Sequence, residues 1–223
     1  MAVLGNRLRR AGFATSLFGY ACVAEDASTN ARRLAAFALA LDQPAPTAAG
    51  PTVADRASAA AATPAMAALP RLHLVGHSAG GVLLLRALAD SAALATRVSR
   101  VVLLGTPYSD SAAAHALRRL PGGHRMLGRT LDEWLSVPRP RPDPRNEVGV
   151  IVGSRAFGLS RIIVRHPGPS DGAVSVDEAR VPGARDGIVL PVAHSALVLS
   201  ARVADEVAAF LRSGQFSAGV PRL

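Results

Sequence analysis

Ser78 stands at the centre of the pentapeptide Gly76-His77-Ser78-Ala79-Gly80. The apolar run at 72–75 predicts a strand and the run at 82–88 predicts a helix, so the serine occupies the turn between them. Glycines two residues before and two residues after the serine let strand and helix approach closely, which pushes the side chain out of the turn. A serine presented in this way can attack a carbonyl carbon once a base takes its proton. We therefore predict a nucleophile at Ser78; the alternative is a glycine-rich turn with an incidental serine.

A serine nucleophile needs a base, and an imidazole with a pKa near 6.5 can serve at neutral pH. In open α/β sheets the functional side chains gather at the carboxyl ends of the strands. Of the six histidines, only His194 follows the carboxyl end of a convincing strand, predicted at 188–192. We expect His194 to be the base, whereas a packing or surface role is the expectation for the others.

A carboxylate should orient that imidazole and stabilise its charged form. Asp171 lies in the turn Pro169-Ser170-Asp171-Gly172, which follows a predicted buried strand at 147–153. Asp171 is therefore the expected acid, and Asp177 or Glu178 remains open as an alternative.

Strands and helices alternate along the chain, which indicates βαβ units around a mostly parallel sheet. We predict one α/β domain over residues 1–223, with an Ala/Pro-rich surface excursion at 43–69 that has little periodicity. Strands are expected at 15–19, 72–75, 101–104, 147–153 and 188–192. Helices are expected at 1–11, from a cap at Ser28 to 41, at 82–89, 112–120 and 131–135, and at 200–212.

Composition sets outer limits on this fold. A chain of 223 residues with 49% hydrophobic and 4% aromatic residues can bury a full aliphatic core. No run of 18 or more apolar residues predicts a transmembrane helix, and no signal peptide is evident, so a cytoplasmic location is expected. The single cysteine, Cys22, excludes an internal disulfide and is expected to be a small buried side chain. No cofactor and no metal are expected.

The formal net charge of +9 invites a nucleic-acid hypothesis. All 25 basic residues are arginines, and they are scattered, with one cluster at Arg139, Arg141 and Arg145 among prolines. Nucleic-acid-binding domains concentrate basic residues on one face or within a known module. Binding to polyanions is therefore the least favoured of the functions considered, and no nucleic-acid partner is expected.

The segments that carry these residues resemble those of lipase-like α/β-hydrolases, most closely small bacterial esterases related to the GPI inositol-deacylase group. The similarity lies in the stretches 74–81 and 103–107, in Asp171-Gly172-Ala173-Val174, and in Leu190-Pro191-Val192-Ala193-His194. The chain order Ser78, Asp171, His194 is the order that α/β-hydrolases use. The resemblance implies an α/β-hydrolase fold, an oxyanion donor in the backbone N–H of Ala79, and a helical cap at 108–145 over the site.

Large apolar residues recur in that expected cap. With His77, which lies beside the nucleophile, three of them form an expected substrate pocket: Met126, Leu131 and Trp134. The alternative is that the apolar residues of this segment only pack the cap onto the body. An apolar pocket would suit a small-molecule or lipid ester.

The chain departs from the family at its start. Such hydrolases open with a strand that ends in His-Gly, whose loop gives a second oxyanion N–H, and no His-Gly precedes residue 15 here. We expect an N-terminally shortened form of a serine carboxylic ester hydrolase acting through a Ser78 acyl-enzyme. The alternative is a catalytically impaired fragment or binding module of the same fold; the sequence does not give the oligomeric state.

Overall fold

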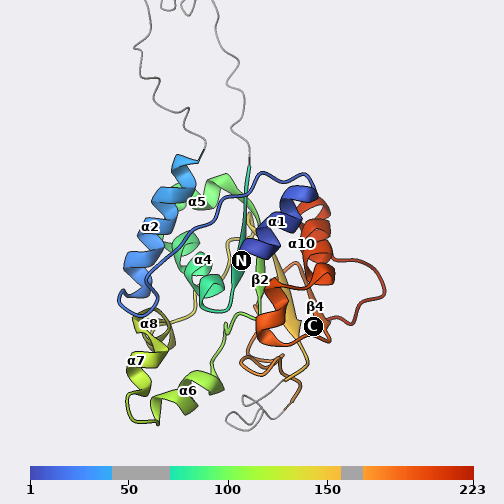
Figure 1. Ribbon diagram of the computed structural model, residues 1–223. Helices are drawn as coiled ribbons and strands as arrows, with labels where there is room; N and C mark the ends of the chain where they lie inside the picture. Colours follow the sequence, from blue (N-terminus) through green and yellow to red (C-terminus); the bar gives the residue numbers. More distant parts are fainter. Residues whose placement is uncertain (42–70, 157–167) are drawn as a thin grey trace, which may run out of the picture.

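The computed structural model describes residues 1–41, 71–156 and 168–223, except for the side chains of His124 and Met126. In this part of the chain, four parallel strands form one sheet in the order β1-β2-β3-β4 (Figure 1). The strands are β1 (Leu72–His77), β2 (Val98–Leu104), β3 (Glu147–Gly153) and β4 (Asp186–Leu190). The predicted excursion at 43–69 lies outside the described residues.

Helices cover both faces of this sheet, as parallel strands require. The helices are α1 (Ala2–Arg10), α2 (Ala27–Ala40), α4 (Ala79–Asp90), α5 (Ala92–Arg97), α6 (Ala112–Arg118), α7 (Gly123–Leu127), α8 (Arg129–Ser136), the 3-10 helix η1 (His194–Val198) and α10 (Ala201–Ser213). The α2, α4 and α5 helices lie on one face, and α1 and α10 lie on the other (Figure 1). The mostly parallel α/β architecture predicted from the sequence is confirmed.

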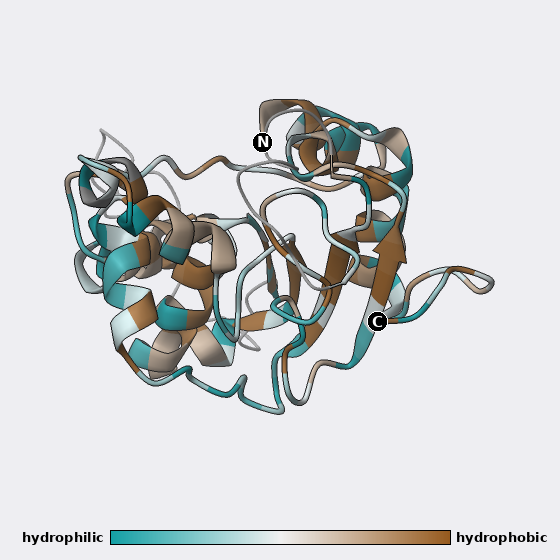
Figure 2. Cartoon of the chain, turned by 90° about the horizontal axis from the view of Figure 1, so that it is seen from below, coloured by the Kyte–Doolittle hydropathy of each residue, from teal (hydrophilic) through white to brown (hydrophobic). Residues whose placement is uncertain are grey.

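Alternating side chains of β2 build the two halves of the core. Val101 and Leu103 pack with α2 and α4, whereas Val102 and Leu104 pack with α1 and α10. All four are fully buried, and each such burial stabilises the fold by about 1.5–3 kcal/mol. Figure 2 shows the result, with hydrophobic strands in the middle and hydrophilic residues on the outer sides of the helices. Among the described helices, none is long and apolar enough to cross a lipid bilayer.

The C-terminal tail protects the outer edge of β4. Arg222 forms an antiparallel bridge with Ile188, and the N–H of Leu223 donates to the carbonyl of Gly187 over 2.9 Å. The Arg222 guanidinium also binds both carboxylate oxygens of Asp186 at 2.8 Å. Among the described strands, β1 is the other outer strand of the sheet.

The beginning of α2 differs from the prediction. The cap is Asp26, whose side chain accepts the N–H of Thr29 over 2.7 Å. Ser28 was expected to cap the helix, but its hydroxyl donates to Glu133 in α8 over 2.6 Å. Both residue types are good caps, so the choice depends on this contact with a residue 105 positions away.

Other expectations were also wrong in detail. Residues 15–19 form no strand, because this segment makes no ladder with the sheet. The β4 strand begins two residues earlier than predicted, where it pairs with β3 from Gly149 onward. The short helices α5 and α7 were not predicted. The Cys22 side chain is exposed rather than buried.

The expected cap at 108–145 contains α6, α7 and α8. The α8 helix packs against α2 and α4, and a buried hydrogen bond of 3.0 Å joins Asn30 in α2 to Thr130 in α8. Both residues are fully buried. This polar contact fixes α8 to the body of the molecule.

Candidate active site

Ser78 lies at a sharp turn between β1 and α4. Its backbone has φ 54° and ψ −128°, and no other described non-glycine residue has a positive φ. A side chain in that conformation costs about 1–3 kcal/mol, which the surrounding structure must hold in place. The prediction of a strand, a tight turn and a helix around this serine is confirmed.

Two glycines are required by space around this turn, and they are not the pair that the pentapeptide suggests. A Cβ on Gly76 would lie 2.7 Å from the backbone of Gly81, and a Cβ on Gly81 would lie 1.9 Å from the hydroxyl of Thr106. A Cβ on Gly80 would meet only the Tyr20 hydroxyl, at 3.7 Å. The helix therefore approaches the strand most closely at Gly81, three residues after the serine.

The first turn of α4 carries the expected oxyanion donor. Ala79 is the first residue of this helix, so its N–H has no acceptor within the helix. The positive end of the helix dipole lies at the same place and favours negative charge. The N–H of Ala79 is therefore available to an oxyanion beside Ser78.

Asp171 is 1% exposed, and protein donors satisfy its carboxylate. One oxygen, Oδ1, accepts the N–H groups of Ala173 and Val174 over 2.9 and 2.8 Å. The other oxygen, Oδ2, lies 2.8 Å from Nδ1 of His194. A buried carboxylate needs such partners, and here they also fix the direction in which it faces the imidazole.

His194 opens η1, four residues past the end of β4. Its N–H donates to the carbonyl of Asp171 over 2.9 Å, so backbone and side chain both bind the same residue. When Nδ1 donates its proton to the carboxylate, Nε2 is left free to accept one. This arrangement is the one a general base requires.

Gly105 brings the serine and this pair together. It follows β2 with φ 51°, and a Cβ there would lie 2.8 Å from Oδ2 of Asp171 and 3.0 Å from Nδ1 of His194. On the other side, the N–H of Ser78 donates to the carbonyl of Leu104 over 2.9 Å. The end of β2 thus adjoins both the turn and the Asp171–His194 pair.

His77 contacts the expected base directly. Its Nε2 lies 3.0 Å from the backbone oxygen of His194, and the two ring centroids are 4.6 Å apart. Burial, and after it the neighbouring His194, lower the pKa of His77 to about 4. The sequence placed His77 in a substrate pocket and did not predict this contact, for which a single sequence carries no signal.

The two alternative acids are bound elsewhere. The Asp177 side chain is 82% exposed and pairs with Arg180 at 3.1 Å. The Glu178 carboxylate accepts the N–H groups of Ala112 and Ser175, which links the loop after Asp171 to the beginning of α6. Among the three candidates, only the Asp171 carboxylate is seen to bind His194.

Trp134 lies in the core, where it is fully buried. Its Nε1 donates to the carbonyl of Pro107 over 3.1 Å, and the Arg139 guanidinium lies 5.1 Å from the ring centroid. Leu131 packs against the same core cluster, and the Met126 side chain lies outside the described part. These positions favour the packing role that the sequence left open over a pocket wall.

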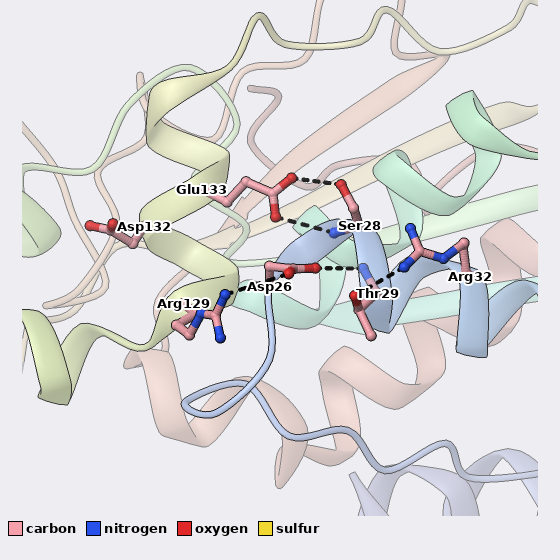
Figure 3. Close-up of a pocket in the computed structure, with 7 residues that line it drawn as sticks. All are labelled: Asp26, Ser28, Thr29, Arg32, Arg129, Asp132 and Glu133. Atoms are coloured by element: carbon pink, nitrogen blue, oxygen red, sulfur yellow. Dashed lines mark hydrogen bonds and ion pairs between the residues drawn. The ribbon is translucent and has the colours of Figure 1, made fainter.

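A hollow of about 390 Å³ lies between the beginning of α2 and α8 (Figure 3). It is lined by Asp26, Ser28, Thr29, Arg32, Arg129, Asp132 and Glu133. Glu133 accepts two hydrogen bonds from Ser28, and Arg129 lies 3.7 Å from Asp26. None of these residues was a candidate from the sequence, and their contacts join α8 to α2.

The arginine cluster does not form a free basic patch. The Arg139 guanidinium binds the carbonyls of Tyr108, Trp134 and Val137, and Arg145 pairs with Asp143 at 2.7 Å. Within the described residues, no three His, Cys, Asp or Glu side chains are grouped as metal ligands.

Comparison with known proteins gives the fold a class. No family model matches the chain, and no curated protein matches it. Among solved structures, the chain is similar to the mature form of the Bacillus licheniformis lipase BlEst2, with a TM-score of 0.58 and 17% identity over 85% of this chain and 74% of the lipase. The propeptide form of that lipase gives a TM-score of 0.51 and 18% identity, over 83% of this chain and 41% of that form.

A metagenomic carboxyl esterase, MGS0156, is also matched, at 23% identity over 57% of this chain and 46% of that protein, with a TM-score of 0.42. The neighbours are esterases and lipases. The parallel sheet flanked by helices, together with the mature lipase as a neighbour, defines an α/β-hydrolase fold. At these identities the comparison establishes the fold, and the activity must be argued from the site.

Proposed function

We propose that this protein is a serine hydrolase of carboxylic esters. Ser78 is the nucleophile, His194 the general base and acid, and Asp171 the residue that orients His194. The N–H of Ala79 stabilises the oxyanion. The observation that carries the proposal is the buried Asp171–His194 hydrogen bond of 2.8 Å next to a serine held at a positive φ.

The reaction follows from these positions in two halves. Nε2 of His194 takes the Ser78 proton while Oγ attacks the ester carbonyl, and the proton then passes to the departing alcohol. Water, deprotonated by the same imidazole, releases the acid from the acyl-enzyme. One oxyanion donor is typically worth about 2.7–4 kcal/mol in the transition state, so the N–H of Ala79 is a substantial part of the barrier reduction.

The expected substrate is a small-molecule or lipid ester, and the chemistry needs no cofactor. Similarity to a lipase and the apolar character of the core-packed 108–145 segment support this substrate class. The acyl chain and the alcohol are not specified by any contact described above.

Hydrolysis of a short-chain p-nitrophenyl ester tests the proposal. Ser78→Ala and His194→Ala should each lower kcat by several orders of magnitude, and the double variant should be scarcely worse than either, because such residues act as a unit. Asp171→Asn should also be severely impaired. Matched controls are Ser136→Ala, which removes an exposed hydroxyl, and Asp177→Asn.

The competing function is a hydrolase fold that binds but does not turn over esters. Near-full activity in Ser78→Ala would contradict the nucleophile. Activity that survives Asp171→Asn but is lost in Asp177→Asn would reassign the acid.

A further inference from the structure

His194 is held by three polar contacts, and only two of them come from Asp171. These two are the Nδ1–Oδ2 bond of 2.8 Å and the N–H bond to the Asp171 carbonyl of 2.9 Å. The third is the contact of 3.0 Å between Nε2 of His77 and the carbonyl of His194. The backbone of His194 is therefore bound on both its N–H and its C=O.

The third contact defines the proton on His77. A carbonyl oxygen can only accept a hydrogen bond, so Nε2 of His77 must carry the proton and donate it. Burial and the neighbouring His194 keep the pKa of His77 at about 4, so its ring is neutral at pH 7. A neutral donor can lie beside His194 without placing a second positive charge there when His194 becomes protonated.

The position of His77 in the chain makes this contact specific. It is the last residue of β1 and directly precedes Ser78, whereas the hydrogen-bonded partner lies 117 residues later. The rings also touch, with centroids 4.6 Å apart and planes tilted by 42°. One side chain therefore links the strand that carries the nucleophile to the loop that carries the base.

We propose that His77 is a positioning residue, which fixes the distance between the Ser78 turn and the His194 imidazole by donating its Nε2–H to the His194 carbonyl. This inference rests on the proposed function, in which His194 deprotonates Ser78. Because a displacement of about 1 Å costs an enzyme on the order of 100-fold in rate, losing the donor should affect turnover rather than substrate binding.

Two variants separate the donor from the ring. His77→Gln keeps an N–H donor of similar reach without the ring, and His77→Phe keeps the ring without the donor. On p-nitrophenyl butyrate, His77→Phe should lower kcat by about 10- to 100-fold with KM changed by less than about twofold, and His77→Gln should recover most of that loss. The control is His73→Gln on the same strand, whose imidazole makes no such contact with the site and which should keep the wild-type kcat.

A second readout does not depend on ester turnover. The proton shared by His194 and Asp171 should give a downfield NMR resonance, assigned by its absence in His194→Ala. In His77→Phe this resonance should shift or broaden, whereas in His77→Gln it should stay close to its wild-type position.

The outcomes are distinct for the two proposals. A wild-type kcat and an unmoved resonance in His77→Phe would overturn the positioning role, as would equal losses in the Phe and Gln variants that track a lower Tm. Wild-type protein that does not hydrolyse esters would contradict the proposed function, and the resonance would still decide the role of His77.

Discussion

The low pKa of His77 predicts a measurable dependence of stability on pH. In the folded protein this pKa is about 4, because burial and the neighbouring His194 disfavour the charged ring. In the unfolded chain the same ring titrates near 6.5. Between these two values the unfolded state binds more protons than the folded state, so the free energy of unfolding falls as pH falls.

The size of the effect follows from the two pKa values. At pH 7.5 the ring is neutral in both states and contributes almost nothing to the pH dependence. At pH 4.5 it is charged in the unfolded state and mostly neutral in the folded state, which lowers the free energy of unfolding by about 2–3 kcal/mol. His77→Gln removes this titration, so wild type should lose about 2–3 kcal/mol more than the variant between pH 7.5 and pH 4.5.

Urea unfolding at both pH values measures this difference. Other titrating groups, including His73, whose pKa burial also lowers, are shared by both proteins and cancel in the comparison. Val75→Ala is the control, because it destabilises the same strand without changing a titrating group and should keep the wild-type pH dependence. Parallel losses in wild type and His77→Gln would refute the assignment of a neutral, buried His77.

Three further predictions concern packing. Gly81→Ala should destabilise the fold by several kcal/mol because its Cβ would lie 1.9 Å from Thr106, whereas Gly80→Ala should be tolerated; equal melting temperatures would contradict the account of the turn. Trp134→Ala should cost about 3–5 kcal/mol in urea unfolding without changing the preferred acyl-chain length, and a changed preference would restore the pocket hypothesis. Glu178→Ala should lower Tm, because buried N–H groups lose their acceptor, and a loss of kcat as deep as that of Asp171→Asn at unchanged Tm would identify Glu178 as the acid.

Local patterns made much of the fold predictable from the sequence. The β3 strand is an uninterrupted apolar run, and α10 has a serine cap, a periodic buried face and a left-handed Gly214 after its end. Both were predicted closely. The candidate Ser78, Asp171 and His194 could be selected because each follows a strand or opens a helix, and such positions meet at one edge of a parallel sheet.

The errors arose where a distant residue decides the local structure. Ser28 and Asp26 are equally good caps until Glu133 binds Ser28. Residues 15–19 have the composition of a strand, yet β-propensity depends on a pairing partner. Trp134 looked like a pocket residue because the sequence does not show that its N–H reaches the carbonyl of Pro107 in the core.

The contact between His77 and His194 was also beyond the sequence. It joins the ends of two segments 117 residues apart, and it depends on where η1 begins relative to β1. Only the assembled sheet places these residues side by side.

Covalent labelling tests the central claim most directly. A fluorophosphonate reacts with an activated serine when Oγ displaces fluoride from phosphorus, and mass spectrometry of the digested protein locates the adduct. The proposed function predicts one adduct on the peptide that contains Ser78 in wild type, none in Ser78→Ala, and a much slower reaction in His194→Ala. An unlabelled wild-type protein, or an adduct that persists in Ser78→Ala, would contradict the assignment of this chain as a serine hydrolase.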